Sequence, residues 1–200
     1  MTLPLVIVNP ASAEAQRART GPKSPVTCAR ILARSPCAFT EAKAHAGELA
    51  AEAARQGTKL IIACGGDGTI SEVANGIIES GQEAELGILP GGTGSDFRRT
   101  LRMPANIAAA ARALRDGRTR KIDAGRVTFV NDHGERETRF FVNVASFGMS
   151  TDVLHRTSSG RATRWIPAFT PRKLTSKLSY AAATVQTTLH CLAHGSQSAT

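Results

Sequence analysis

The stretch "IIACGGDGTISE", residues 61 to 72, runs from apolar residues through a glycine turn into a helix-like pattern. An aspartate and a threonine are set among three glycines in this turn. Such a turn is either a plain strand-to-helix corner or a seat for phosphates, because the amides that open a helix carry partial positive charge. Both interpretations predict a buried strand here, followed by a helix through about Ile78.

A second turn repeats these features. The apolar run "AELGILP", residues 84 to 90, predicts a strand that leads into "GGTGSDF". Its glycines, Gly91, Gly92 and Gly94, flank Thr93, and Asp96 follows in the first predicted helical turn. Neither turn ends in the G-K-[ST] of a P-loop or spells the dinucleotide motif G-x-G-x-x-G. Two such turns favour a ligand more than one does, although glycine and aspartate caps alone would explain each.

The segments around the turns predict an α/β fold with a doubly wound parallel sheet. "PLVIVN" near the N-terminus and "TKLIIAC" before the first turn are short buried strands. Helices are predicted from Thr40, as the capping residue, to Gly57, around residues 95 to 101, and over "NIAAAARALRDG" with Asn106 as its cap. Alternating strands and helices indicate a sheet covered on both faces. Residues 11 to 36 predict no clear element.

The pattern changes near residue 120. "GRVTFV", the polar turn "NDHGE" and "TRFFVNVAS" predict a β-hairpin with no helix between its strands. "SKLSYAAATVQTTL" predicts a later helix, and the last residues are small and polar. The expected organisation is an α/β domain over 1–120, the start of a β-rich second domain over 121–188, and an unstructured tail over 189–200.

Composition indicates a globular protein. The 200 residues are 42% hydrophobic and 20% charged, and no apolar run approaches the roughly 18 residues that span a bilayer. No basic region precedes the apolar N-terminus, so a cytoplasmic location is expected. The four cysteines form no C-x-x-C pair and are expected to be free thiols. A metal site at "HCLAH", residues 190 to 194, is disfavoured because no cluster supplies a third ligand.

Positive charge is concentrated late in the chain. The net charge is +9, and no Asp or Glu follows Asp152. The cations in that region are Arg156, Arg161, Arg164, Arg172, Lys173 and Lys177. This basic segment, 156–177, suits phosphorylated ligands or an anionic membrane surface, whereas nucleic acid is disfavoured for lack of an aromatic platform or a DNA-binding motif. A solvated surface with its acidic complement elsewhere explains it equally well.

The motifs together resemble a known family. "GGDGTISEVANGI" and "PGGTGSDFRR" are similar to the nucleotide-binding motifs of the diacylglycerol kinase catalytic-domain family, which includes bacterial lipid kinases and sphingosine kinases. "VNP" at 8–10, "KIDAGRV" at 121–127 and "FVNVASFGMSTDV" at 141–153 follow the family pattern in the same order. The resemblance spans about residues 5 to 187. It implies an ATP-binding α/β domain, similar to those of NAD kinases and phosphofructokinases, followed by a β-rich domain.

The resemblance also implies site residues. Those of the nucleotide site would be Asn9, Thr40, Gly65, Gly66, Asp67, Gly68, Thr69, Ile70, Ser71, Glu72, Gly92, Thr93, Gly94 and Asp96. Asp67 and Asp96 would belong to a network of water and Mg²⁺, and Glu72 would orient the ligand. Taken as a residue alone, Asp67 has three explanations: it holds Mg²⁺, orders metal-bound water, or fixes the loop by bonding its amides. Ser71, Ser95 and Gly91 depart from the residues commonest in the family.

The catalytic base is the part that the resemblance does not supply. In the family this is an acidic residue late in the second domain, and none follows Asp152 here. The remaining acids of the second domain, Asp123, Asp132, Glu135, Glu137 and Asp152, match no such motif. One hairpin and one helix are also too little to close a β-rich domain. The expectation is a chain truncated relative to its family, with a frameshift near residue 188 as the suggested cause.

The favoured function is transfer of the γ-phosphate of ATP to the hydroxyl of a diacylglycerol-like lipid at a membrane surface. Trp165, Ile166, Pro167 and Phe169 lie among arginines, which suits either contact with anionic lipid or ordinary packing. Three alternatives stand beside it: a non-catalytic nucleotide-binding remnant, an NAD kinase-like enzyme, and turns that bind no ligand. The second glycine turn favours the lipid kinase over the NAD kinase.

Overall fold

The computed structural model describes residues 3–11, 35–91, 96–117, 119–131, 133–145 and 184–185. The chain forms two compact units, Met1–Val144 and Ala145–Thr200. In the second unit only Ala145, Thr184 and Val185 are described, and the last two are helical. The basic segment and most of the helix predicted near the C-terminus therefore lie outside the described residues. The predicted domain limits stay predictions.

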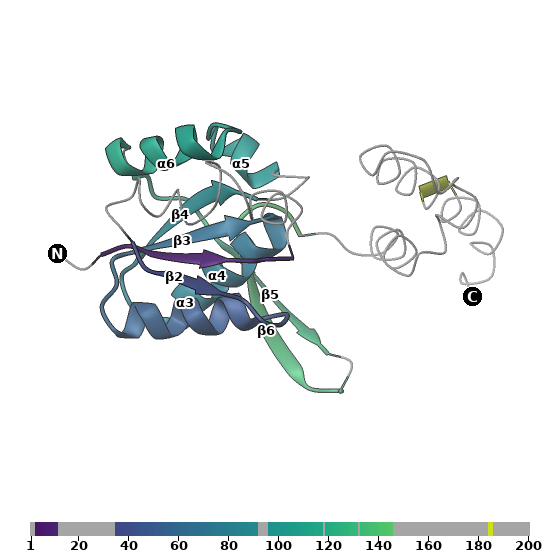
Figure 1. The fold of residues 1–200 in the computed structure, drawn as a ribbon. Coiled ribbons are helices and arrows are strands. Elements are labelled where there is room, and N and C mark those ends of the chain that lie inside the picture. The colour runs from purple at the N-terminus through teal and green to yellow at the C-terminus, as the bar shows by residue number, and fades with distance from the viewer. Residues whose placement is uncertain are drawn as a thin grey trace. The chain divides into compact units, whose positions relative to one another are not determined.

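The first unit is built on a parallel sheet of four strands (Figure 1). Its order is β2 (Cys37–Phe39), β1 (Leu5–Val8), β3 (Leu60–Gly65) and β4 (Glu85–Pro90), and every neighbouring pair is parallel. The predicted α/β fold is confirmed. Strand β2 was not predicted, because three residues after a stretch rich in proline carry too little pattern to indicate a strand.

Helices cover both faces of this sheet. Helices α3 (His45–Arg55) and α4 (Asp67–Ser80) pack on one face, and α6 (Ile107–Asp116) packs on the other (Figure 1). Side chains of β3 alternate between the two cores: Ile61 and Ala63 join the α3/α4 side, whereas Ile62 and Cys64 join the α6 side. Burial on both sides explains why the strand reads as an unbroken apolar run.

Helices α3 and α4 approach each other closely. Alanines on the inner face of α3 leave room for α4, and Gly47 and Gly76 lie where the two helices meet. A Cβ atom added to Gly76 would stand 2.1 Å from the carbonyl oxygen of Gly47. Gly76 thus permits the contact that fixes α4, and with it the first glycine turn, against the rest of the unit.

Two predicted helix ends are confirmed and one is wrong. Asn106 caps α6, with its Oδ1 accepting hydrogen bonds from the N–H groups of Ala108 and Ala109 at 3.0 and 3.1 Å. Gly57 takes a φ of +86° just past the end of α3, as a helix-terminating glycine does. Thr40, however, does not cap α3. That helix begins at His45 after Ala44, which has a φ of 70° and makes no side-chain cap.

The predicted hairpin is present. Strands β5 (Gly125–Val130) and β6 (Arg136–Phe141) pair antiparallel and form a sheet of their own. The short helix α5 (Asp96–Thr100), which follows the second glycine turn, sends Phe97 into the core on the α3/α4 side. Val142, just after β6, packs against the same core. The hairpin therefore belongs to the first compact unit.

Candidate functional site

The predicted site residues gather at one edge of the sheet. Asn9 follows β1, Thr40 follows β2, the first glycine turn follows β3, and Gly91 follows β4. Backbone hydrogen bonds align these strand ends, because the N–H of Asn9 donates to the carbonyl of Cys64 at 3.1 Å and that of Gly91 to Gly65 at 3.0 Å. Ligands of doubly wound sheets bind at this carboxyl edge. Gly92, Thr93 and Gly94 lie outside the described residues.

Thr69 ties the first turn to β1. Asn9 donates from Nδ2 to the Thr69 hydroxyl at 3.1 Å, and its Oδ1 accepts the N–H of Ala11 at 2.9 Å. The Thr69 side chain is 5% exposed and lies over Gly65, where a Cβ atom would stand 2.5 Å from its Oγ1. Gly65 is thus needed for packing. The Thr69 hydroxyl shapes the turn through its bond with Asn9.

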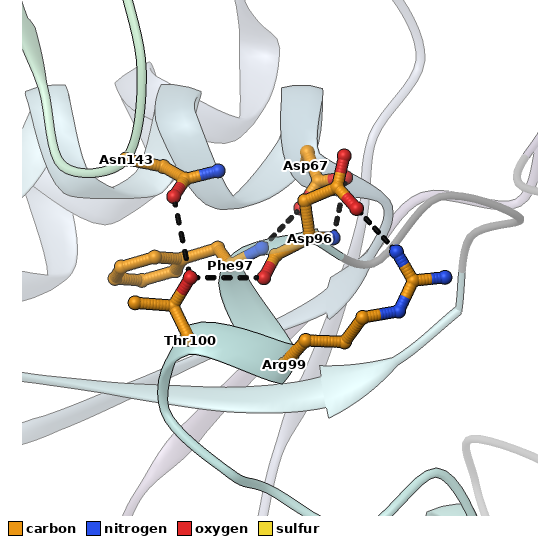
Figure 2. Close-up of polar contacts among 6 residues, drawn as sticks. All are labelled: Asp67, Asp96, Phe97, Arg99, Thr100 and Asn143. Atoms are coloured by element: carbon orange, nitrogen blue, oxygen red, sulfur yellow. Dashed lines mark hydrogen bonds and ion pairs between the residues drawn. The ribbon is translucent and has the colours of Figure 1, made fainter.

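Asp67 joins the two glycine turns. Its Oδ2 accepts the N–H of Asp96 at 3.2 Å and its Oδ1 accepts the N–H of Phe97 at 3.1 Å, so a carboxylate at the start of α4 bonds the start of α5 (Figure 2). The Asp96 carboxylate in turn bonds Arg99, and both side chains are largely exposed. Among the three explanations of Asp67, the structure shows bonding to loop amides. Each Asp67 oxygen keeps lone pairs for a further contact.

Glu72 holds the start of α3. Its carboxylate oxygens accept the N–H groups of Ala44 and Ala46 at 3.0 and 3.3 Å. The capping group that Thr40 does not supply therefore comes from another helix, and its negative charge suits the positive end of α3. Through this bond Glu72 fixes the segment that carries Thr40. The role predicted for Glu72, orienting a ligand, is not tested by these contacts.

Glu72→Ala is expected to lower the free energy of unfolding by about 1–2 kcal/mol, because α3 loses its only side-chain cap among the described residues. Urea denaturation measures the change. Glu79→Ala is the matched control, since Glu79 is an exposed glutamate on the same helix. Surface substitutions of that kind change stability by no more than about 0.5 kcal/mol. Equal effects of the two substitutions would contradict the capping role.

Three observations at this edge bear on whether it suits an anionic ligand. Gly66, which precedes this 14-residue helix, makes no side-chain cap, and no side chain in the described parts of the chain bonds the first-turn amides of α4. A Cβ atom added to Gly68 would meet nothing within 4 Å. Thr40 is only 8% exposed, and within the described residues its hydroxyl has no hydrogen-bond partner. A nucleotide fits these residues.

The remaining predicted residues contribute differently. Ile70 is 2% exposed and packs in the core, so it offers a ligand only its backbone. The Ser71 carbonyl accepts a hydrogen bond from Nδ2 of Asn75 at 2.8 Å. Across the parts of the chain that the structure describes, no three His, Cys, Asp or Glu side chains group as metal ligands. A Mg²⁺ ion at Asp67 and Asp96 would therefore need oxygens from water and phosphate to complete its shell.

Comparison with known proteins decides the family. The sequence profile of the diacylglycerol kinase catalytic domain matches residues 4–127, more than half of the chain. The chain belongs to the diacylglycerol kinase catalytic domain family. It is 35% identical over 154 residues to a diacylglycerol kinase of Staphylococcus haemolyticus and 34% identical over 154 residues to one of Staphylococcus epidermidis, in each case over 77% of this chain.

A solved structure supports the same family. The crystal structure of a diacylglycerol kinase from Bacillus anthracis superposes with a TM-score of 0.51 at 30% identity, covering 66% of this chain and 47% of that one. The chain spans 44% and 46% of the two staphylococcal relatives, less than half of their length. Within the described residues, no helix is both long and apolar enough to cross a bilayer.

Asn75 joins α4, the helix of the first glycine turn, to β6, a role that was not predicted from the sequence. It is 9% exposed on α4, and its carboxamide bonds both backbone groups of Phe140 in β6. A second contact was also missed: the Thr100 hydroxyl of α5 bonds the Asp96 carbonyl at 3.2 Å and lies 3.5 Å from Oδ1 of Asn143 (Figure 2). One signal was available for Asn75: an amide set among Val73, Ala74 and Ile77 must be satisfied if that face is buried.

Proposed function

We propose that this protein binds ATP with Mg²⁺ at the carboxyl edge of its sheet and transfers the γ-phosphate to the hydroxyl of a diacylglycerol-like lipid. The proposal rests above all on one arrangement, the first glycine turn, whose open Gly68 and uncapped amides face the edge where the buried Thr40 hydroxyl lies. Membership of the diacylglycerol kinase family supports the acceptor class.

The residues have separable roles in this proposal. The amides at the start of α4 bind phosphate oxygens, and Asn9 and Thr69 hold the turn in the shape that exposes those amides. Asp67 keeps the second turn next to the first and, with Asp96, would hold Mg²⁺ through water. The ion, when bound, offsets the negative charge of the phosphates. The acceptor hydroxyl attacks the γ-phosphorus as the bond to ADP breaks, and its proton passes to a base.

Binding without transfer is the second candidate. The observation that favours it is the distribution of acids: the family's base is expected late in the second domain, and residues 153–200 contain no Asp or Glu. The proposed membrane contact rests on the basic segment, which lies outside the described residues. Both points are open to direct test on the 200-residue chain.

Radiolabelled γ-phosphate provides that test. The chain is incubated with labelled ATP, Mg²⁺ and anionic vesicles that contain diacylglycerol, and we expect label in phosphatidic acid. Parallel reactions contain a long-chain sphingoid base or NAD⁺ as acceptor, and neutral vesicles report the need for an anionic surface. Label in NAD⁺ alone would favour the NAD kinase-like alternative. Bound Mg-ATP with no label in any acceptor would overturn the transferase proposal and leave the non-catalytic one.

A further inference from the structure

Asn75 stands between the helix of the first glycine turn and the second sheet. It lies on α4, eight positions after Asp67, and is 9% exposed. Its Nδ2 donates to the carbonyls of Ser71 and Phe140, each at 2.8 Å, and its Oδ1 accepts the N–H of Phe140 at 2.7 Å. Both amide hydrogens and the amide oxygen are thus used. A buried carboxamide satisfied in this way has one favoured orientation.

The Asn75 carboxamide bonds the backbone of β6 as a neighbouring strand would. Phe140 pairs with Arg126 across the hairpin, and its N–H and C=O both bond Asn75, so they point away from β5. The carboxamide of Asn75 therefore occupies the place that a peptide group of a third strand would take. It fixes the register of β6 against α4 with one donor and one acceptor.

Apart from the packing of β6 against α4, the hydrogen bonds that join the hairpin to the rest of the described residues are those of Asn75. Its sheet has two strands, Val127 and Phe129 are 39% and 40% exposed, and its base lies next to α4 while its tip extends away from the first sheet (Figure 1). A two-stranded hairpin is marginally stable by itself and depends on packing against another element. The position of β6 is therefore set largely through Asn75 and the residues that follow it in the chain.

Those residues reach the second glycine turn. Val142 packs against the core that holds Phe97, and Oδ1 of Asn143 lies 3.5 Å from the Thr100 hydroxyl, which also bonds the Asp96 carbonyl at 3.2 Å. Asp67 bonds the start of α5, and Thr100 lies at its end. Helix α4, helix α5 and the end of β6 are consequently joined in a closed circuit of side-chain contacts.

We propose that Asn75 is a positioning residue, which holds the first hairpin of the second sheet in register against α4 and transmits nucleotide binding at the start of α4 to that hairpin. The transmission rests on the proposed ATP site, whereas the positioning rests on the printed contacts alone. In a lipid kinase this coupling would link the occupied ATP site to the part of the protein expected to present the acceptor.

Amide hydrogen exchange of the full chain, measured by NMR, tests the positioning without nucleotide. In Asn75→Ala the Phe140 amide loses its acceptor, so its exchange is expected to be faster by about tenfold or more. The amide of Ala110, which donates to the carbonyl of Asn106 in α6, is the internal reference and is expected to keep its rate. Phe140 exchanging at the wild-type rate would overturn the proposal, as would equal acceleration at both amides, which would indicate general destabilisation.

The same measurement with saturating Mg-ATP tests the transmission. In the wild-type chain we expect the nucleotide to slow exchange at Phe140. In Asn75→Ala that response is expected to disappear while the Mg-ATP dissociation constant changes by less than about threefold, since no phosphate donor is removed. A Phe140 response that persists in the variant, or is absent from a wild-type chain that binds Mg-ATP, would overturn the transmission.

Two further variants make the result specific. Asn75→Ser keeps a donor for the Ser71 carbonyl but is too short to reach Phe140, so it is expected to give the same faster exchange at Phe140 and replaces the alanine variant in the test if that variant does not fold. Asn106→Ala removes another asparagine that accepts two backbone N–H groups, and the response of Phe140 to Mg-ATP is expected to survive it. If the wild-type chain binds no Mg-ATP, the proposed function and the transmission fail together, and the nucleotide-free comparison still decides the positioning.

Discussion

Gly76→Ala is expected to lower the free energy of unfolding by about 2 kcal/mol or more. The added methyl group would stand 2.1 Å from the Gly47 carbonyl oxygen, and that oxygen belongs to a helix backbone that cannot turn aside. Overpacking of this kind costs about 1–3 kcal/mol and occasionally more, which exceeds the gain of up to about 1 kcal/mol that alanine brings to a helix. Chemical denaturation measures the difference.

Gly68→Ala is the matched control, because it makes the same substitution on the same helix where a Cβ atom meets nothing within 4 Å. It is expected to leave stability unchanged or raise it by up to about 1 kcal/mol. If Gly76→Ala were as stable as Gly68→Ala, the close contact between α3 and α4 would not exist in solution. The comparison separates a glycine required by packing from one that packing does not require.

Gly68→Ala is also expected to weaken Mg-ATP binding by about tenfold or more, equivalent to about 1.4 kcal/mol. Among the described residues nothing fills the space at Gly68, so their packing gives no reason for glycine there. Close approach of phosphate oxygens to the amides of the turn gives one. Isothermal titration calorimetry of the wild-type and variant chains measures the change. An unchanged affinity would show that phosphates do not bind over this part of the turn.

A glycine that serves ligand binding is expected to show opposite effects when it is replaced by alanine: the protein keeps or gains stability, while its affinity for the ligand falls. Gly65 does not offer this test, since a Cβ atom there would collide with Thr69 and disturb the fold. Only Gly68, of the glycines in the first turn with a described environment, combines open space with a place at the helix start. Its substitution therefore reports on the ligand with the least interference from folding.

Local patterns in the sequence predicted most of the first sheet. Apolar runs gave β1, β3 and β4, the glycine turns gave the starts of α4 and α5, and Asn106 gave the start of α6. Each of these features depends on residues that are close in the sequence, so the sequence alone was enough to predict it. Strand β2 was missed because its three residues gain strand geometry from pairing with β1.

The contacts that shape the site were not predicted, because they join residues far apart in the chain. Asp67 bonds amides 29 and 30 positions away, Glu72 caps a helix that begins 27 positions earlier, and Asn75 reaches Phe140 across 65 positions. The types of these residues suggested polar roles, but their partners depend on the fold. Thr40 shows the reverse error, since a good capping residue near a helix start was taken as the cap while the fold supplied Glu72.

The contacts in the structure divide the residues predicted for the nucleotide site into two groups. Asn9, Thr69, Asp67 and Glu72 bond other parts of the protein and so build the edge. The Thr40 hydroxyl has no hydrogen-bond partner among the described residues, and the space beside Gly68 is filled by none of them. A bound ligand would supply contacts that the residues of the second group lack. Nucleotide binding is therefore the central claim.

Thermal unfolding of the 200-residue chain with and without Mg-ATP tests that claim most directly. At about 100 times its dissociation constant, the nucleotide should stabilise the native state by roughly 2.7 kcal/mol and raise the unfolding midpoint clearly. The shift should shrink when Mg²⁺ is chelated and in Asp67→Ala, which separates the two glycine turns. A cooperative transition that millimolar Mg-ATP leaves in place would contradict the nucleotide site.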